Sequence, residues 1–183
     1  MPHLTTDQLE QHLDHLRAAP VDDGTLRLVV RRPAVRVREV TAEGLLDPEK
    51  GLVGDNWLVR GSRHTPDGSA DQEAQVTVMN HRMVAVLAPD PEAQSLAGDQ
   101  LYVDLDLSVA NLPAGTRLAV GDAVLEVSAK PHTGCAKFVE RFGDDAMRFV
   151  NGRTGRALRL RGLNAKVVVG GSVRTGDPVR KLR

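Results

Sequence analysis

The chain has 183 residues, enough for a single domain with a hydrophobic core, and this length excludes two full catalytic domains. Hydrophobic residues make up 41% of the sequence and aromatic residues only 3%, so aliphatic side chains must form the core, and stacking platforms for single-stranded nucleic acid are not expected. No apolar run is long enough to span a bilayer, and residues 1–10 lack the layout of a signal peptide. We therefore expect a cytoplasmic protein that binds neither nucleic acid nor membranes.

The formal net charge of zero hides an uneven distribution of charge along the chain. Residues 130–183 carry thirteen Lys or Arg against four acids, a net of +9, and residues 1–129 carry the balancing −9. A basic final third on a near-neutral chain favours a local anion site over a nucleic-acid surface. Solvated faces whose charges cancel in the fold explain the same pattern.

The first element predicted along the chain is a helix. Residues 5–20 begin with a threonine cap, place Leu9, Leu13 and Leu16 on one stripe, and end at Pro20. This pattern predicts one short amphipathic helix.

Strand-like segments separated by turn residues dominate the rest of the chain. The stretch 41–71 is rich in glycine and charge but has little periodicity, and it predicts a loop. Short strands with turn chemistry between them favour a sandwich or barrel over parallel-sheet units. Residues 26–30 and 35–40 predict two strands, or one edge strand broken at Pro33. Further strands are predicted at 74–80, 101–107, 116–121, 123–129 and 164–182, the last with a hairpin between two glycine turns. Short helices are predicted at 83–88 and, broken at Gly143, at 136–150.

Cys135 is the only cysteine, so the chain forms no internal disulfide and no multi-cysteine metal site. It follows a predicted strand and precedes a predicted helix, with Lys130, His132 and Lys137 within five residues. A helix N-terminus and nearby cations favour a thiolate, which can act as a metal ligand or a sulfur carrier. The alternative is a small, buried and inert cysteine.

The other glycine- and arginine-bearing segments give weaker signals. None of the glycine turns has the Walker or dinucleotide spacing, which disfavours nucleotide binding by those routes. One or two of Arg153, Arg156, Arg159 and Arg161 could clamp a phosphate, and a solvated face explains the group equally well.

Five motifs occur in order between residues 41 and 182: GLVGDNW, AGDQLYVDLDLSVANLP, NLPAGTRLAVGDAVLEVS, KPHTGCAKF, and NGRTGRALRLRGLNAKVVVGGSVRTGDPV. Together they resemble the MOSC domain, named for the C-terminal domain of molybdenum cofactor sulfurase. The resemblance implies a mainly β (α+β) fold, a MOSC-type β-barrel with a few short helices. We expect residues 1–24 to form an N-terminal helix and linker and residues 25–183 to form the single MOSC domain.

The resemblance also implies a site. The family's cysteine, which binds or relays sulfur or ligates molybdenum in a pterin cofactor, corresponds to Cys135, the expected catalytic residue and molybdenum ligand. Basic and polar residues cradle the pterin and its phosphate in members that hold the molybdenum cofactor (molybdopterin). The residues expected to do so here are Lys130, His132, Lys137, Arg153, Arg156, Asp99 and Gln100.

The function expected from the resemblance is binding of the molybdenum cofactor or relay of its sulfur by a stand-alone MOSC-type protein. One version is a component of a molybdenum-dependent reductase of N-hydroxylated compounds, with electrons from a partner reductase. Another is a sulfur carrier supplied by a cysteine desulfurase, with pyridoxal phosphate held only by that partner. Gln100 and Asn56 depart from the family pattern, which leaves open a non-catalytic accessory module that keeps the barrel without cofactor chemistry. A redox-responsive dimer formed through Cys135 is a further alternative.

Overall fold

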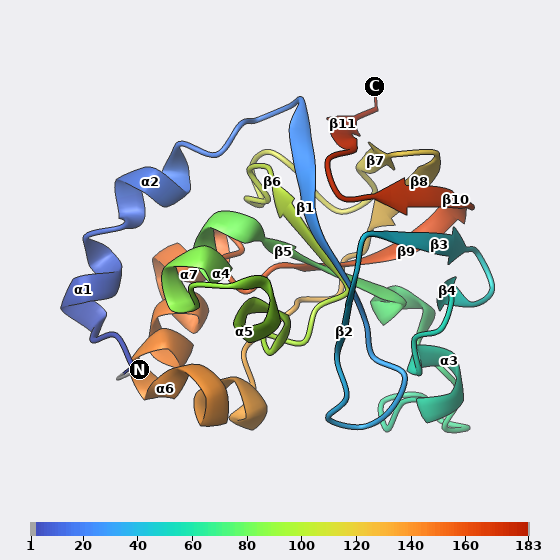
Figure 1. Ribbon diagram of the computed structural model, residues 1–183, viewed down its shortest axis with the longest axis horizontal. Helices are drawn as coiled ribbons and strands as arrows, with labels where there is room; N and C mark the ends of the chain where they lie inside the picture. Colours follow the sequence, from blue (N-terminus) through green and yellow to red (C-terminus); the bar gives the residue numbers. More distant parts are fainter. Residues whose placement is uncertain (1–2, 183) are drawn as a thin grey trace.

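Seven strands close into a mixed barrel in the computed structural model, which describes residues 3–182 (Figure 1). The strands are β1 (Gly24–Arg31), β5 (Val76–Asn80), β6 (Leu101–Asp104), β7 (Arg117–Val120), β8 (Ala123–Val127), β9 (Leu163–Val169) and β11 (Pro178–Lys181). Their order is β11-β7-β8-β9-β5-β6-β1, and pairing of β1 with β11 closes the ring. Only β5 and β6 run parallel among these pairs within residues 3–182. The predicted barrel and its mainly β (α+β) class are confirmed.

Four further strands lie beside the barrel. They are β2 (Glu39–Thr41), which extends the sheet at β1, and a three-stranded sheet of β10 (Gly171–Arg174), β3 (Glu43–Asp47) and β4 (Gly51–Leu52). The expectation of a loop over 41–71 is therefore wrong, since this stretch also holds helix α3 (Trp57–Arg60). The predicted hairpin within 164–182 is also wrong, because β10 pairs with β3 from the other end of the sequence.

Most helices gather on one side of the barrel (Figure 1). They are α1 (Thr6–Glu10), α2 (Leu13–Arg17), α4 (His81–Leu87), α5 (Pro91–Ser95), α6 (Ala136–Asn151) and α7 (Arg153–Ala157), and a 3₁₀ turn, η1 (Gln72–Ala74), precedes β5. The single helix predicted over residues 5–20 is wrong, since a turn at Gln11 and His12 separates α1 from α2. The predicted break at Gly143 is confirmed, because its φ of 87° interrupts α6.

Two hydrophobic clusters form the core. One fills the barrel with aliphatic side chains such as Leu26, Val78 and Leu125. The other lies between the barrel and the helices and includes Leu9 and Phe138, so α1 and α6 share one core layer. No helix among residues 3–182 combines the length and the apolar composition needed to cross a bilayer. Met1, Pro2 and Arg183, at the ends of the predicted segments 1–24 and 25–183, lie outside the described residues.

The burial of Leu9 predicts that the N-terminal helix contributes to global stability. Leu9 is fully buried in the second cluster, whereas Glu10 beside it is exposed. Leu9→Ala should lower the free energy of unfolding by about 2–4 kcal/mol, because it leaves a cavity as well as losing apolar contact. Glu10→Ala should change it by less than about 0.5 kcal/mol. Equal urea midpoints for the two variants would show that α1 lies outside the cooperative unit.

Candidate functional site

Cys135 lies at the N-cap of α6, at the end of the segment 129–135, which we call the Cys135 loop. β8 ends at Val127 and α6 begins at Ala136, so the predicted position between a strand and a helix is confirmed. The carbonyl of Cys135 accepts the first bond of α6, from the Phe138 amide at 2.8 Å. Its thiol makes no capping hydrogen bond and is exposed, so a reaction partner can reach the sulfur.

The Cys135 loop has no regular structure, but side chains from several elements hold it. Lys130 forms an ion pair with Asp71. The Gly134 amide donates to Asn151 Oδ1 at 3.0 Å, which ties the residue before the cysteine to the far end of α6. The other tethers are Asn164 Nδ2 to the carbonyls of Lys130 and Pro131, and His132 to Asp99. These bonds fix the thiol relative to the barrel.

Asp99 is the buried centre of this arrangement. Its side chain is 0% exposed, and its two oxygens accept bonds from His132 Nε2 at 2.7 Å and from Arg161 Nη1 at 2.5 Å. Burial would raise the pKa of Asp99, but Arg161 and His132 outweigh it and lower that pKa to about 2. Arg161 also donates to the carbonyl of Ala97 at 2.9 Å and lies over the Phe138 ring. The carboxylate therefore joins the Cys135 loop to the segments before β6 and β9.

The thiol faces a cleft of about 210 Å³ in which every charged lining side chain is a cation. We call it the Cys135 cleft. Its walls come from the loop after β1, from α3, from the turn before β6 and from the start of α6. The charged side chains that line it are Arg32, Arg36, Arg38, Arg60, Lys137, Arg141 and Arg161. Such a concentration of positive charge favours an anionic ligand.

Buried carboxylates orient two of these arginines. Arg32 forms a bidentate pair with Asp55, with Nε at 2.7 Å and Nη2 at 2.9 Å from the carboxylate oxygens, and donates Nη1 to the Gly98 carbonyl at 2.9 Å. Asp99 orients Arg161 through a single bond to Nη1, while Nη2 of Arg161 donates to the Ala97 carbonyl. Both guanidinium groups are thereby held at the cleft wall without the entropy cost of ordering them when a ligand arrives.

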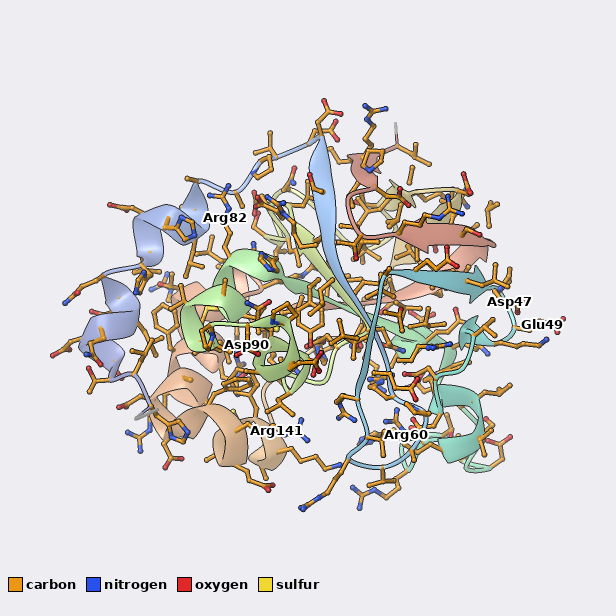
Figure 2. All side chains as sticks on the ribbon, viewed as in Figure 1. Asp47, Glu49, Arg60, Arg82, Asp90 and Arg141 are labelled. Carbon is orange, nitrogen blue, oxygen red and sulfur yellow. The ribbon has the colours of Figure 1, made fainter. Side chains whose placement is uncertain are left out.

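The remaining cations have weaker partners within the protein. Burial and the neighbouring Arg141 and Arg32 lower the pKa of Arg38, and burial and Arg32 lower that of Arg60. Arg60 on α3 and Arg141 on α6 both lie toward the lower edge of the molecule in Figure 2 and line the same cleft. The like charges repel one another, and a bound anion would relieve that repulsion.

Three polar atoms of the cleft residues have no hydrogen-bond partner among residues 3–182 although each is buried: Arg38 Nε, Asn56 Oδ1 and Arg161 Nε. Buried polar atoms are usually paired, so an unpaired set at one cleft points to a partner supplied by water or a ligand. Two donors and one acceptor fit a ligand that carries both an anionic group and hydrogen-bond donors.

The structure brings together only some of the residues predicted for the site. Lys137 lines the Cys135 cleft. Lys130 and His132 line two neighbouring cavities, one of them between α3 and β5. Asp99 and Gln100 are fully buried, and Gln100 Oε1 accepts from the amide and the hydroxyl of Thr77, both at 2.7 Å. Both residues position neighbouring segments of the site through buried hydrogen bonds, and neither has a surface that a ligand could contact.

The two predicted arginines of the GRTGR turn lie elsewhere. Arg156 lines a cavity that does not include Cys135, and Arg153 is exposed on α7 and lines none of these three clefts. The cations that do face the thiol come largely from the acidic first part of the chain: Arg32, Arg36, Arg38 and Arg60. Arg32, Arg36 and Arg38 lie in the run RRPAVRVR at 31–38, whose second half is predicted as a strand, and Arg60 lies in the stretch predicted as a loop.

Fold and site together define a β-barrel protein with one exposed thiol in a cationic cleft. The MOSC domain profile matches residues 67–180, more than half of the chain, and the chain belongs to the MOSC domain family. No curated protein matches it.

Solved structures share the fold at low sequence identity. The YuaD protein from Bacillus subtilis is 16% identical with a TM-score of 0.65, covering 87% of this chain and 97% of YuaD. YiiM from Escherichia coli is 21% identical with a TM-score of 0.54, over 87% of this chain and 70% of YiiM. YiiM from Geobacillus stearothermophilus is 14% identical with a TM-score of 0.53, over 90% and 75%.

The buried Asp99 predicts a specific loss of stability in acid. Because its pKa falls from 3.8 to about 2 on folding, its ionised form stabilises the fold above pH 4, and this contribution is lost as the pH falls toward 2. Asp99→Asn should be less stable than wild type by about 3–5 kcal/mol at pH 7, because Arg161 loses its counter-charge. The difference should narrow by about 2 kcal/mol between pH 5 and pH 2. Urea unfolding across this range measures it, and a difference independent of pH would contradict the assignment.

Proposed function

We propose that the Cys135 cleft binds the molybdenum cofactor, with its phosphate on the cleft arginines and the Cys135 thiolate as ligand to the metal or as carrier of its sulfur. The observation that carries this proposal is the position of the one exposed thiol in a cleft whose charged residues are all cations. A thiolate is a soft ligand suited to such a centre. The wider MOSC family supports the same ligand class.

The residues present fit the cofactor. A phosphate monoester needs several charge-assisted donors, and Arg38, Arg60 and Arg141 have no carboxylate partner among residues 3–182. The pterin carries ring N–H donors and carbonyl acceptors, which match the unpaired Asn56 Oδ1 and Arg161 Nε. The bound cofactor would supply two-electron redox chemistry or a terminal sulfur at its metal.

The protein's own residues fix the position of the Cys135 sulfur and of the arginines around it. The bonds of the Cys135 loop fix the position of Sγ, and Arg32 and Arg161 stay oriented because Asp55 and Asp99 hold them. His132 does not serve as the base for this thiol in our proposal, because its imidazole is bonded to Asp99 and lines the neighbouring cavities instead.

The sulfur-carrier version requires one exchange step. The Cys135 thiolate attacks the outer sulfur of a persulfide on a partner cysteine desulfurase, a new S–S bond forms on Cys135, and the partner's thiolate leaves. Pyridoxal phosphate belongs to that partner. The reductase version requires a partner reductase to deliver electrons, and N-hydroxylated compounds are the substrates to screen.

The accessory-module alternative rested on Gln100 and Asn56. Gln100 bonds within the core, to Thr77 and to the Gln75 carbonyl, so its departure from the family pattern does not alter the cleft surface. Asn56 does line the cleft. Of the two departures only Asn56 therefore bears on ligand binding, and the accessory module becomes one outcome of the experiment below.

Cofactor content tests the proposal directly. Protein purified from a host that makes the cofactor and is fed molybdate should carry near-stoichiometric molybdenum by elemental mass spectrometry. Cys135→Ser should lose the metal while keeping the fold. Arg38→Ala combined with Arg60→Ala should lower the pterin content at least about tenfold, since each lost charge-assisted bond costs about 1.5–3 kcal/mol.

The matched control is Arg153→Ala, an exposed arginine outside the cleft, which should retain full metal and pterin. Molybdenum absent from wild type, together with no persulfide on Cys135 after incubation with a cysteine desulfurase and cysteine, would overturn both versions and leave the accessory module. A persulfide without bound metal would select the sulfur carrier.

A further inference from the structure

A second cavity, of about 320 Å³, is lined by residues 129–133 of the Cys135 loop but not by Cys135 itself. It is bounded by α7, by the segment leading into β9 and by Val109 of the loop after β6, and we call it the α7 cavity. Val109, Val150 and Leu163 give it apolar walls. Arg161 lines both this cavity and the Cys135 cleft, so the two spaces are neighbours across one buried side chain.

The polar part of the α7 cavity is cationic. Its lining includes Arg156 and Arg159 but no acid, and neither arginine has a carboxylate partner among residues 3–182. Arg159 donates to the carbonyls of Leu112 at 2.5 Å and Leu107 at 3.4 Å, which holds its guanidinium, and burial lowers its pKa. Arg156 is free to meet a ligand. An apolar wall with unpaired cations suits an organic anion.

His132 lines the α7 cavity, as it does the cavity between α3 and β5, and it supplies a hydrogen-bond acceptor there. Asp99 is ionised, so His132 Nε2 must donate to it across the 2.7 Å bond. The second ring nitrogen, Nδ1, has no hydrogen-bond partner within the described part of the chain. Burial, reinforced by Arg161, lowers the pKa of His132, which keeps Nδ1 unprotonated at neutral pH. An acceptor held by a buried carboxylate can select a ligand that carries a hydroxyl or N–H group.

We propose that the α7 cavity binds a small aromatic anion, with its ring against Val109, Val150 and Leu163, its carboxylate on Arg156, and a hydroxyl or N–H donor on His132 Nδ1. This site is separate from the Cys135 cleft and requires neither molybdenum nor the thiol. Because Arg161 lines both spaces, a ligand in the α7 cavity lies next to the Cys135 cleft and can influence binding there.

The test is a titration by ligand-observed and protein-observed NMR with 3- and 4-hydroxybenzoate. The methoxybenzoates serve as probes without a donor, and the hydroxybenzyl alcohols serve as neutral probes. Wild type should bind the better hydroxybenzoate at least about tenfold more tightly than its neutral analogue. Arg156→Ala should remove that preference, and Arg153→Ala, on the same short helix but outside the cavity, should keep it.

The donor contact has its own comparison. The hydroxybenzoate should bind more tightly than the methoxybenzoate, and His132→Gln should abolish this difference. If that variant fails to fold, the comparison in wild type still decides the point. No binding by any hydroxybenzoate, equal binding by the neutral probes, or unchanged binding in Arg156→Ala would each overturn the proposal. Cys135→Ser should bind the hydroxybenzoates normally, so this result is independent of the molybdenum content.

Discussion

The ion pair of Asp99 with Arg161, together with the hydrogen bond that His132 donates to Asp99, is the constraint on which the site depends. A carboxylate that is 0% exposed is costly to bury, and only two cationic or donating partners at 2.5 Å and 2.7 Å make it tolerable. Those partners come from segments far apart in the chain, the Cys135 loop and the approach to β9. Loss of either one would leave one of the two buried carboxylate oxygens of Asp99 unpaired. The position of the cysteine loop on the barrel is thus tied to the stability of the core.

Asp55 repeats this design on the other wall of the Cys135 cleft. It holds Arg32 through two bonds, and its Oδ1 also accepts from the Trp57 amide at 2.9 Å at the start of α3. The Gly98 carbonyl, next to Asp99, accepts a further bond from Arg32. Asp55 of the GLVGD motif and Asp99 of the GDQL motif therefore have the same structural role. Each is a positioning residue that holds an arginine at the cleft and has no exposed oxygen to offer a ligand.

Much of the barrel could be predicted from sequence, because its strands alternate or run apolar between turn residues, as do β5, β7 and β8. The strand β3 could not, since its glycine and exposed leucine give no local pattern and its pairing with β10 is visible only in three dimensions. The run RRPAVRVR alternates like a strand, yet its middle forms a turn in which Val37 bonds back to Ala34 and Val35 is 69% exposed. Alternation predicts a strand only where a neighbouring strand is present to pair with it.

For the site, too, sequence neighbours identify only those residues that lie close to Cys135 along the chain. Cys135 and Lys137 could be identified because a helix start and a cation lie beside the thiol in sequence. Arg32, Arg38 and Arg60 could not, because only closure of the barrel brings them to it.

Closure of the barrel also brings like charges together, and the resulting electrostatic repulsion destabilises the fold. Seven cations converge on one cleft without a lining acid, and repulsion among Arg32, Arg38 and Arg141 lowers the pKa of Arg38 further than burial does alone. Replacing such side chains by neutral ones would relieve the repulsion. Stability therefore gives no reason to place Arg38, Arg60 and Arg141 here, since none of them has a carboxylate partner among residues 3–182, whereas binding does. A multiply charged anion held beside a fixed thiol is the condition under which the arginines, the unpaired polar atoms and the exposed sulfur all have partners.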